Sequence, residues 1–456
     1  MIVGGRLRPN TSDGRAPILV LAGMAGAASA LCAGWLVGGG NVVAPLGLAL
    51  LAPVIVVVAR LQAVHWLVVW LLVSGFLGWV PGLRAPGDLP EATPERVVLL
   101  LIVVSVALRA GRWRIGRVGA FLALFSADYF LTAAFESADF RAATLTFLHH
   151  YASAFVVFGL ASSGLRTDSS RQLLTRAGAV VGGLLAAVAL VQPHTGWDLG
   201  AEPGEWSNRI AGTLITPPNL GAALAILLVL GLYQATAGRL HWRVVATGTV
   251  GIMAAAILLT FTRAAWASLL VGVGVVGLLA IRRRPMLFLV LLAGIVLSIA
   301  ALPPLIDALT DDPRLRDDRN AIGRYETSLL SVQQFAQRPL FGWGPDTIRY
   351  FSGPGGYHGW VSHNSFLSLL VATGLVGGTL YLLPVGLATS RGVRSAWVSA
   401  GAGGLHSFAL AGAATYIVNA LAIDMKYFAL PHTLFWLCLG VLLGPAATDR
   451  TMREAP

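Results

Sequence analysis

The chain alternates between long apolar stretches and short polar connections along nearly its whole length. A helix rises 1.5 Å per residue, so a hydrocarbon core about 30 Å thick needs about 20 apolar residues to cross it. Fourteen stretches are candidates, the fourth of them short, and twelve to fourteen transmembrane helices are therefore expected. The candidates lie near residues 16–37, 41–59, 62–80, 97–110, 118–135, 145–165, 177–192, 218–237, 244–262, 264–281, 286–306, 364–384, 396–420 and 427–445.

Composition excludes a soluble globular protein. Of the 456 residues, 56% are hydrophobic and 12% are charged, and the mean hydropathy is +0.74. Soluble domains carry about 25% charged residues. The predicted fold class is an all-α membrane protein, a polytopic bundle of about 12–14 transmembrane helices with a large extracytoplasmic loop carrying short helices.

The net charge of +11 does not indicate a nucleic-acid partner, because the basic residues occur in ones, twos and threes between apolar stretches. We interpret them as topology signals. With a cytoplasmic N-terminus, strict alternation places 20 of the 32 Lys and Arg residues inside, with only four acids. The outside receives 12 basic residues against 16 acids. This distribution obeys the positive-inside rule and predicts that both termini are cytoplasmic.

Two predicted extracytoplasmic segments, residues 193–217 and 307–362, are too long to be turns. Loops of more than about 15 residues in a compact protein are usually functional or disordered. Within the second segment, residues 325–335 have the pattern of an amphipathic helix, which indicates an ordered loop.

Arginines near these segments are candidates for binding an anion. Residues 244–281 form an apolar run of 38 residues, about 57 Å as one helix, so we expect a break there, with Arg263 beside it on the outer side. Snorkelling to the interface is the alternative role for Arg263. Arg209 precedes Pro217, at a predicted helix start where free N–H groups favour anionic oxygen, although a solvated loop arginine is the alternative.

His363 is the main candidate for chemistry. It stands with Asn364 at the outer mouth of the predicted span 364–384. A lone interfacial histidine is more often structural, but the topology places three arginines on the same side: Arg209, Arg263 and Arg324. A base that titrates near neutral pH, beside permanent cations and without metal-ligand spacing, suits transfer from a diphosphate donor.

Three further polar residues are weaker candidates. Asp128 lies within a predicted span, where an ionised carboxylate is costly, so it is either partnered or functional. His149 and His150 begin the predicted span 145–165 on the outer side, but a zinc site needs further ligands that the sequence does not supply nearby.

Several of these segments together resemble the O-antigen ligase and polysaccharide polymerase family of GT-C-type membrane glycosyltransferases. The strongest similarity is Pro339-Leu-Phe-Gly-Trp-Gly-Pro345, followed by His363-Asn-Ser-Phe-Leu367 and Thr373-Gly-Leu-Val-Gly377. Arg209-Ile-Ala-Gly-Thr213 and Thr262-Arg263 resemble two upstream family motifs. The resemblance covers about residues 200–445. The chain departs from the family at Ser368 and Ala372, where acids are frequent, and at Ala264, where glycine is frequent.

The resemblance implies a polyisoprenyl-diphosphate-linked glycan as donor, in the outer leaflet of the bacterial cytoplasmic membrane, and a glycan or lipid as acceptor. It implies that Arg263 and Arg324 hold the diphosphate and that His363 activates the acceptor hydroxyl, without a metal, a nucleotide sugar or another cofactor. The expected domains are N-terminal transmembrane helices over 1–200, a catalytic membrane region over 201–445 that includes loop 307–362, and a cytoplasmic tail over 446–456. The predicted substrate-binding residues are Arg209, Asn364, Tyr325, Trp343 and Arg338.

A transporter or flippase for polysaccharide or lipid-linked glycan is the alternative. It predicts sequence repeats, midplane charges and short outer loops. The chain has no convincing repeat, one midplane acid and two long outer loops, so an enzyme is favoured. Ligase and polymerase share the donor chemistry, and the sequence does not distinguish between them.

Overall fold

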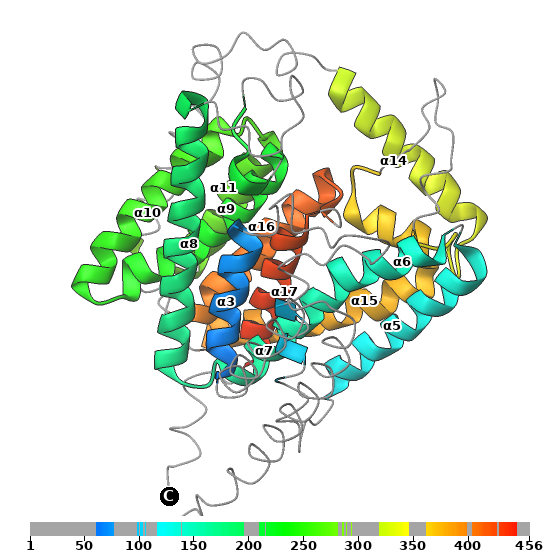
Figure 1. Cartoon of the computed structure of the whole chain (residues 1–456), viewed down its shortest axis with the longest axis horizontal. Coiled ribbons are helices and arrows are strands. Elements are labelled where there is room, and N and C mark those ends of the chain that lie inside the picture. Colours follow the sequence, from blue (N-terminus) through cyan, green and yellow to red (C-terminus); the bar gives the residue numbers. More distant parts are fainter. Residues whose placement is uncertain are drawn as a thin grey trace, which may run out of the picture. The chain divides into compact units, whose positions relative to one another are not determined.

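A computed structural model places a large part of the chain. The chain divides into two compact units, Met1–Gln62 with Leu100–Trp113, and Ala63–Leu99 with Arg114–Pro456. The description below concerns the second unit (Figure 1). The residues that the structure describes are 61–76, 98–99, 101–103, 105, 116–137, 139–195, 209–214, 216–280, 285–286, 289, 293, 319–345, 362–398, 404–425 and 428–444.

Every described element is helical, which confirms the all-α membrane fold class. Seven helices are long and apolar enough to cross a membrane, and three shorter helices are also apolar. The α-helices are α3 Ala63–Phe76, α5 Arg117–Glu136, α6 Phe140–Thr146, α7 Ser153–Gly164, α8 Asp168–Thr195, α9 Pro217–Ala237, α10 Leu240–Leu259, α11 Arg263–Ala280, α14 Arg319–Gln337, α15 Ser365–Val398, α16 Leu405–Ala422 and α17 Ala429–Leu443. A π-helix, η1, spans Phe147–Ala152 and a 3-10 turn, η2, spans Gly212–Leu214.

Ten of the fourteen predicted spans coincide with these helices. Most residues of the other four, near 16–37, 41–59, 97–110 and 286–306, lie outside the described part of the chain. The predicted amphipathic helix is present as part of α14, which is longer than expected. Helix α8 continues through Pro193 to Thr195, so the loop predicted to begin at residue 193 begins slightly later.

Helix α9 forms the centre of the packing. Its residues are buried on all sides from Leu220 to Leu230, as expected of an apolar helix surrounded by others. It contacts α8, α10, α11, α16 and α17, and a second group is formed by α7, α15 and α16 around α17 (Figure 1). Small residues allow close approach of helix pairs, for example Gly440 against Ala161 and Gly272 against Thr415.

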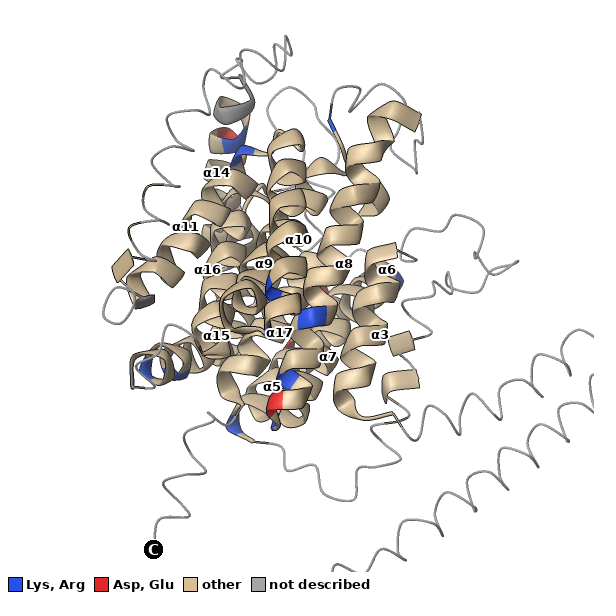
Figure 2. Ribbon diagram, turned by 90° about the vertical axis from the view of Figure 1, so that its left-hand side faces the viewer, with Lys and Arg blue, Asp and Glu red and all other residues tan. Residues whose placement is uncertain are grey.

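Hydrogen bonds near the helix termini show which termini lie together at each of the two ends of the helix bundle. At one end, the Thr213 hydroxyl donates to the Gly75 carbonyl, and Arg324 donates to the carbonyl of Ala422, where α16 ends. At the other, Arg171 donates to Leu165, where α7 ends. We call these the His363 end and the opposite end. The grouping agrees with strict alternation of the helices across a membrane, and charged residues lie mainly near helix ends and in connections (Figure 2).

Helix α15 is broken, which corrects the predicted span 364–384. Gly374 has φ 64° and ψ −165°, outside the helical region. The backbone folds back there, so that a Cβ on Gly378 would meet the Leu370 side chain, which an unbroken helix would hold about 12 Å away along its axis. Residues 365–373 therefore form a short separate helix. The 24 residues of 375–398, about 36 Å long, are by themselves long enough to cross a membrane.

The loop at residues 339–345 satisfies the backbone groups that this break exposes. The N–H groups of Leu375 and Val376 donate to loop carbonyls over 2.7 and 3.1 Å. In return, the loop N–H groups of Trp343 and Gly344 donate to α15 carbonyls over 2.8 and 3.0 Å. Irregular backbone at membrane depth persists only where such partners exist. The motif Pro339–Pro345 thus has a structural reason for its spacing from Gly374.

Candidate functional site

His363 directly precedes the short helix that begins at Ser365. Asn364 caps this helix, because its Oδ1 atom accepts hydrogen bonds from the backbone N–H groups of Phe366 and Leu367 over 3.0 and 3.1 Å. The cap fixes the direction of the chain at residue 363. The structure therefore gives Asn364 a positioning contact, and its predicted contact with substrate stays a prediction.

Ser365 connects this helix to the turn between α16 and α17. Its hydroxyl donates to the Ile423 carbonyl over 3.1 Å and accepts from the Met425 N–H over 2.7 Å. The residue between these two partners is Asp424, whose side chain is buried, with 3% exposure. The two hydrogen bonds thus hold a buried carboxylate close to His363.

The imidazole of His363 is in an environment that favours its neutral form. Burial lowers the pKa of His363 from its ordinary value of 6.5, and the positive charge of Arg324 lowers it further. The negative charge of Asp424 acts in the opposite direction. Because the net direction is downward, the ring is neutral and able to accept a proton near pH 7.

Arg324 is a half-buried cation close to His363. One guanidinium nitrogen donates to the Ala422 carbonyl over 3.3 Å, at the negative end of the α16 dipole, while its Nε atom is buried without a hydrogen-bond partner among the described residues. Burial lowers the pKa of Arg324, and the charge of Arg263 lowers it further. Two guanidinium groups therefore lie close enough to repel each other, an arrangement that an anion would stabilise.

The predicted break between α10 and α11 is present, and Arg263 is the first residue of α11. At the break, Phe261 has φ 48°, which is unusual for a residue with a side chain. Arg209 holds this turn, because its side chain donates to the Thr260 carbonyl over 2.8 Å and to the Thr262 hydroxyl over 3.0 Å. Arg209 thus supports the segment that presents Arg263, and a direct substrate contact of Arg209 stays a prediction.

Arg338 and Trp343 form a second structural cluster. The guanidinium of Arg338 lies 4.2 Å from the centre of the Trp343 ring and forms an ion pair with Glu136 at the end of α5. The indole N–H of Trp343 donates to the Gln334 carbonyl over 2.8 Å. These contacts join α14, α5 and the loop that follows α14. The predicted role of Arg338 and Trp343 in substrate binding is not tested by them.

Tyr325 also points away from the candidate site. It is adjacent to Arg324 in sequence, but its side chain is 71% exposed, whereas the Arg324 head is buried against α16. Successive residues of a helix point about 100° apart, which accounts for the difference. Its predicted contact with substrate stays a prediction.

The weaker candidates lie elsewhere. Asp128 of α5 faces Gly377 of α15, where an added Cβ would meet its carboxylate. His149 and His150 lie on η1, with ring centres 4.7 Å apart. Among the described residues, no group of three or more His, Cys, Asp or Glu residues could hold a metal ion.

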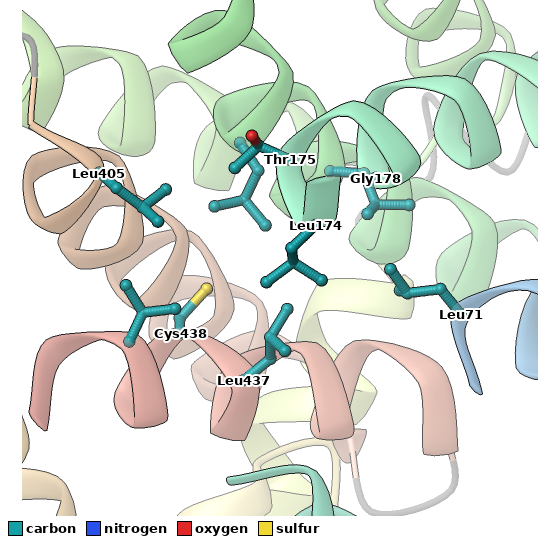
Figure 3. Close-up of a pocket in the computed structure, with 10 residues that line it drawn as sticks. Leu71, Leu174, Thr175, Gly178, Leu405, Leu437 and Cys438 are labelled. Carbon is teal, nitrogen blue, oxygen red and sulfur yellow. The ribbon is translucent and has the colours of Figure 1, made fainter. Parts of the chain in front are cut away.

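Cavities in the described residues are small. One of about 20 Å³, measured as space for the centre of a water molecule, lies under the short helix of α15 and is lined by Ser365, Tyr416 and His432 among others. That volume is enough for about one water. Another of about 10 Å³, shown in Figure 3, is apolar and lies between leucines, Thr175 and Cys438 in the helix core. Its lining contains no acidic or basic side chain.

Asp424 is the site residue that the sequence analysis missed. It is an acid in a very short connection between two predicted spans, and that placement was the available signal. Its nearness to His363 depends on the hydrogen bonds of Ser365, 58 and 60 positions away in sequence.

The comparison with known families agrees with this arrangement. The family model described as O-antigen ligase matches residues 248–382. Over this domain, the chain is similar to the O-antigen ligase family. This domain reaches from α10 into α15 and contains Arg263, Arg324 and His363, whereas Arg209 and Asp424 lie outside the matched residues. The match supports the O-antigen ligase and polymerase family, and with it a ligase-type or polymerase-type activity in a multi-pass membrane protein.

No curated protein matches the chain. The similarity to the O-antigen ligase family thus rests on residues 248–382. Residues 339–345 hold the break in α15 through backbone hydrogen bonds. Arg263 lowers the pKa of Arg324, and Arg324 lowers the pKa of His363.

Proposed function

We propose that this protein transfers a glycan from a polyisoprenyl diphosphate to an acceptor hydroxyl at the extracytoplasmic face of the bacterial inner membrane. One observation carries the proposal: Arg263, Arg324 and His363 come from three separate segments, yet Arg263 lies close enough to Arg324 to lower its pKa, and Arg324 does the same to His363. A buried carboxylate, Asp424, completes the group. The transfer needs a base, which His363 supplies, and a positively charged site for the diphosphate, which Arg263 and Arg324 supply.

Arg263 and Arg324 form the donor site in this proposal. Their mutual repulsion in the free protein is relieved when a diphosphate lies between them, and the Nε–H of Arg324 is available to donate to it. Negative charge grows on the diphosphate as the bond to the sugar breaks. Guanidinium donors already aimed at that charge stabilise the transition state, and one such donor is worth about 100-fold in rate.

His363 is the general base. Its neutral ring accepts the proton of the acceptor hydroxyl while that oxygen attacks the anomeric carbon of the donor sugar. The bond from this carbon to the phosphate oxygen breaks, and polyisoprenyl diphosphate leaves with the electron pair. Asp424 then stabilises the imidazolium, because its charge favours the protonated ring. A single displacement of this kind inverts the anomeric configuration, and the proposed steps require no metal or other cofactor.

The extracytoplasmic location rests on charge. In the described part of the chain, the basic residues of the opposite end outnumber acids strongly: Arg117, Arg166, Arg171, Arg176, Arg239, Arg243, Arg391 and Arg394 against Asp168. By the positive-inside rule, this end is cytoplasmic. The His363 end, where lipid-linked glycan would meet its acceptor, then faces the other side.

The test is an assay of the purified protein in detergent with a polyisoprenyl-diphosphate-linked glycan and an acceptor. A new glycosidic bond, inverted at the anomeric carbon, and released polyisoprenyl diphosphate are expected, with unchanged yield in the presence of a metal chelator. Glycan movement across vesicles without bond formation would instead support the transporter alternative.

The acceptor distinguishes a ligase from a polymerase, and glycan analysis of a deletion strain identifies it. Loss of a ligase leaves long chains that are not attached to their acceptor. Loss of a polymerase leaves single repeats. Mass spectrometry of the accumulated glycans separates these outcomes.

A further inference from the structure

Helix α14 carries polar and apolar residues on opposite sides, and the polar side faces the protein. Arg324, Ser331 and Gln334 point inward, and the last two are 1% and 8% exposed. Ser331 donates to the Thr327 carbonyl within the helix. The Arg324 side chain donates to α16, and the backbone carbonyl of Gln334 accepts from Trp343 of the following loop. On this inward side, Arg324 belongs to the candidate site.

The opposite side of α14 is an exposed apolar stripe. Ile322, Tyr325, Leu329 and Val332 are 55%, 71%, 47% and 47% exposed. Their spacing of three, four and three residues places them on one face of the helix. In a helix docked on a water-exposed surface, the apolar face would be expected inside. An apolar face turned outward indicates an apolar partner.

Further exposed apolar residues lie after α14 and at the end of α5. After α14 the chain reaches Leu340 and Phe341, which are 58% and 57% exposed. Ser137, just after α5, fixes this loop by donating to the Pro345 carbonyl over 2.8 Å. At the adjoining end of α5, a helix long and apolar enough to cross the membrane, Phe135 is 81% exposed.

We propose that α14 is an interfacial helix whose stripe of Ile322, Tyr325, Leu329 and Val332 lies in the outer leaflet of the membrane, with lipid acyl chains as its partner. A helix with this distribution lies in the membrane plane at the boundary between headgroups and acyl chains. In Figure 1, α14 lies at the edge of the described helices, and it packs against α15.

This placement has a consequence for the donor site and, in that respect only, rests on the proposed function. Arg324 is on the side of α14 opposite the stripe. If the stripe lies in the acyl chains, the guanidinium is held at about the depth of lipid phosphates. A diphosphate on a lipid could then reach Arg324 by lateral diffusion, without leaving the membrane.

Site-directed spin labelling tests the lipid contact directly. Both native cysteines, Cys32 and Cys438, are replaced, and single labels are placed at positions 322, 329 and 332 of the stripe in protein reconstituted in nanodiscs. The matched controls are labels at Glu326 and Gln333, which are also exposed on α14 but flank the stripe. We expect the stripe labels to be several-fold more accessible to oxygen than to a water-soluble nickel chelate, and the reverse at the controls.

Three results would overturn the proposal. Equal access of nickel chelate to all five labels would place α14 in water. Protection of the stripe from both reagents would mean that another part of the chain covers it. Spin–spin broadening that disappears on dilution with unlabelled protein would identify a second copy as the partner. None of these measurements requires transfer activity, so they remain informative if the proposed function is wrong.

A paired variant tests the link to the donor. Leu329→Ser with Val332→Ser should raise KM several-fold for a long-chain lipid-linked donor in nanodiscs and leave kcat unchanged. The control Gln333→Ser should change neither. A short-chain donor that is soluble in water should show no difference between the variants. An unchanged KM for the long-chain donor would contradict the role of the stripe in donor access.

Discussion

Arginines occur at both ends of the helix bundle, and the two groups have different surroundings. At the opposite end, Arg171 donates to Leu165 and pairs with Asp168 at 3.6 Å. Arg176 donates to Gln172 over 2.7 Å. These hydrogen-bond and ion-pair partners are within six positions in sequence, although Arg176 also lies 5.0 Å from the centre of the Trp242 ring on α10. At the His363 end, Arg324 instead reaches a carbonyl 98 positions away and lies close to the like charge of Arg263.

The comparison teaches that burial alone does not identify a functional arginine. Arg171 is 8% exposed, yet its bonds are those of a residue that holds a helix end in place. Arg324 is brought by tertiary structure beside a like charge, Arg263, which lowers its pKa. Groups that perturb one another in this way are typical of functional sites. Variants at the two ends should therefore fail in different ways.

The largest expected difference is between two histidines. His363→Gln should lower kcat about 1,000-fold, because it removes the proposed base. His406→Gln is the control: His406 is also buried, but its ring contacts the Gly444 carbonyl at the opposite end. Its variant should retain kcat. Transfer rates of the two purified proteins decide the matter, and full activity of His363→Gln would refute the proposed mechanism.

The next difference is between Arg324→Gln and Arg171→Gln. The first should lower kcat about 100-fold without lowering the free energy of unfolding, since it also removes repulsion from Arg263. The second should leave kcat unchanged and lower the free energy of unfolding by about 1–3 kcal/mol, because it leaves the Leu165 carbonyl without its donor. Equal losses of kcat in the two variants would contradict the proposed difference between a catalytic and a structural arginine.

A third difference concerns the backbone of α15. Gly374→Ala should destabilise the protein by about 2 kcal/mol, because φ is 64° and a Cβ would collide with the Leu340 carbonyl. Gly386→Ala on the same helix is the control. A Cβ there meets nothing within 4 Å, so it should be neutral or stabilise the helix by up to about 1 kcal/mol. Thermal unfolding of both variants provides the measurement.

The smallest effects should appear in the pH dependence of kcat/KM, on its acid side. Activity falls as pH falls through the pKa of His363, because only the neutral ring accepts a proton. Arg324→Gln removes a charge that lowers this pKa, so the midpoint should move to higher pH. Asp424→Asn removes a charge that raises it, so the midpoint should move to lower pH. Shifts in the same direction for both variants would contradict the proposed arrangement.

The sequence by itself determined the membrane class and the approximate positions of most of the described apolar helices. An apolar run of about 20 residues has few stable solutions in a bilayer, and this constraint is local. The break before Arg263 followed from length alone, since 38 apolar residues exceed the hydrocarbon thickness. The candidate residues His363, Arg263 and Arg324 could be chosen because the positive-inside rule assigns each loop to a side.

Tertiary structure decided what those residues contact. The break at Gly374 depends on hydrogen bonds from a loop about 30 positions earlier, and hydropathy shows only a continuous span there. The position of Asp424 depends on Ser365, and Arg209 proved to hold the turn before Arg263. The outward direction of the apolar stripe of α14 also depends on tertiary structure. Periodicity predicts that a helix has two faces, but only its neighbours decide which face is turned toward them.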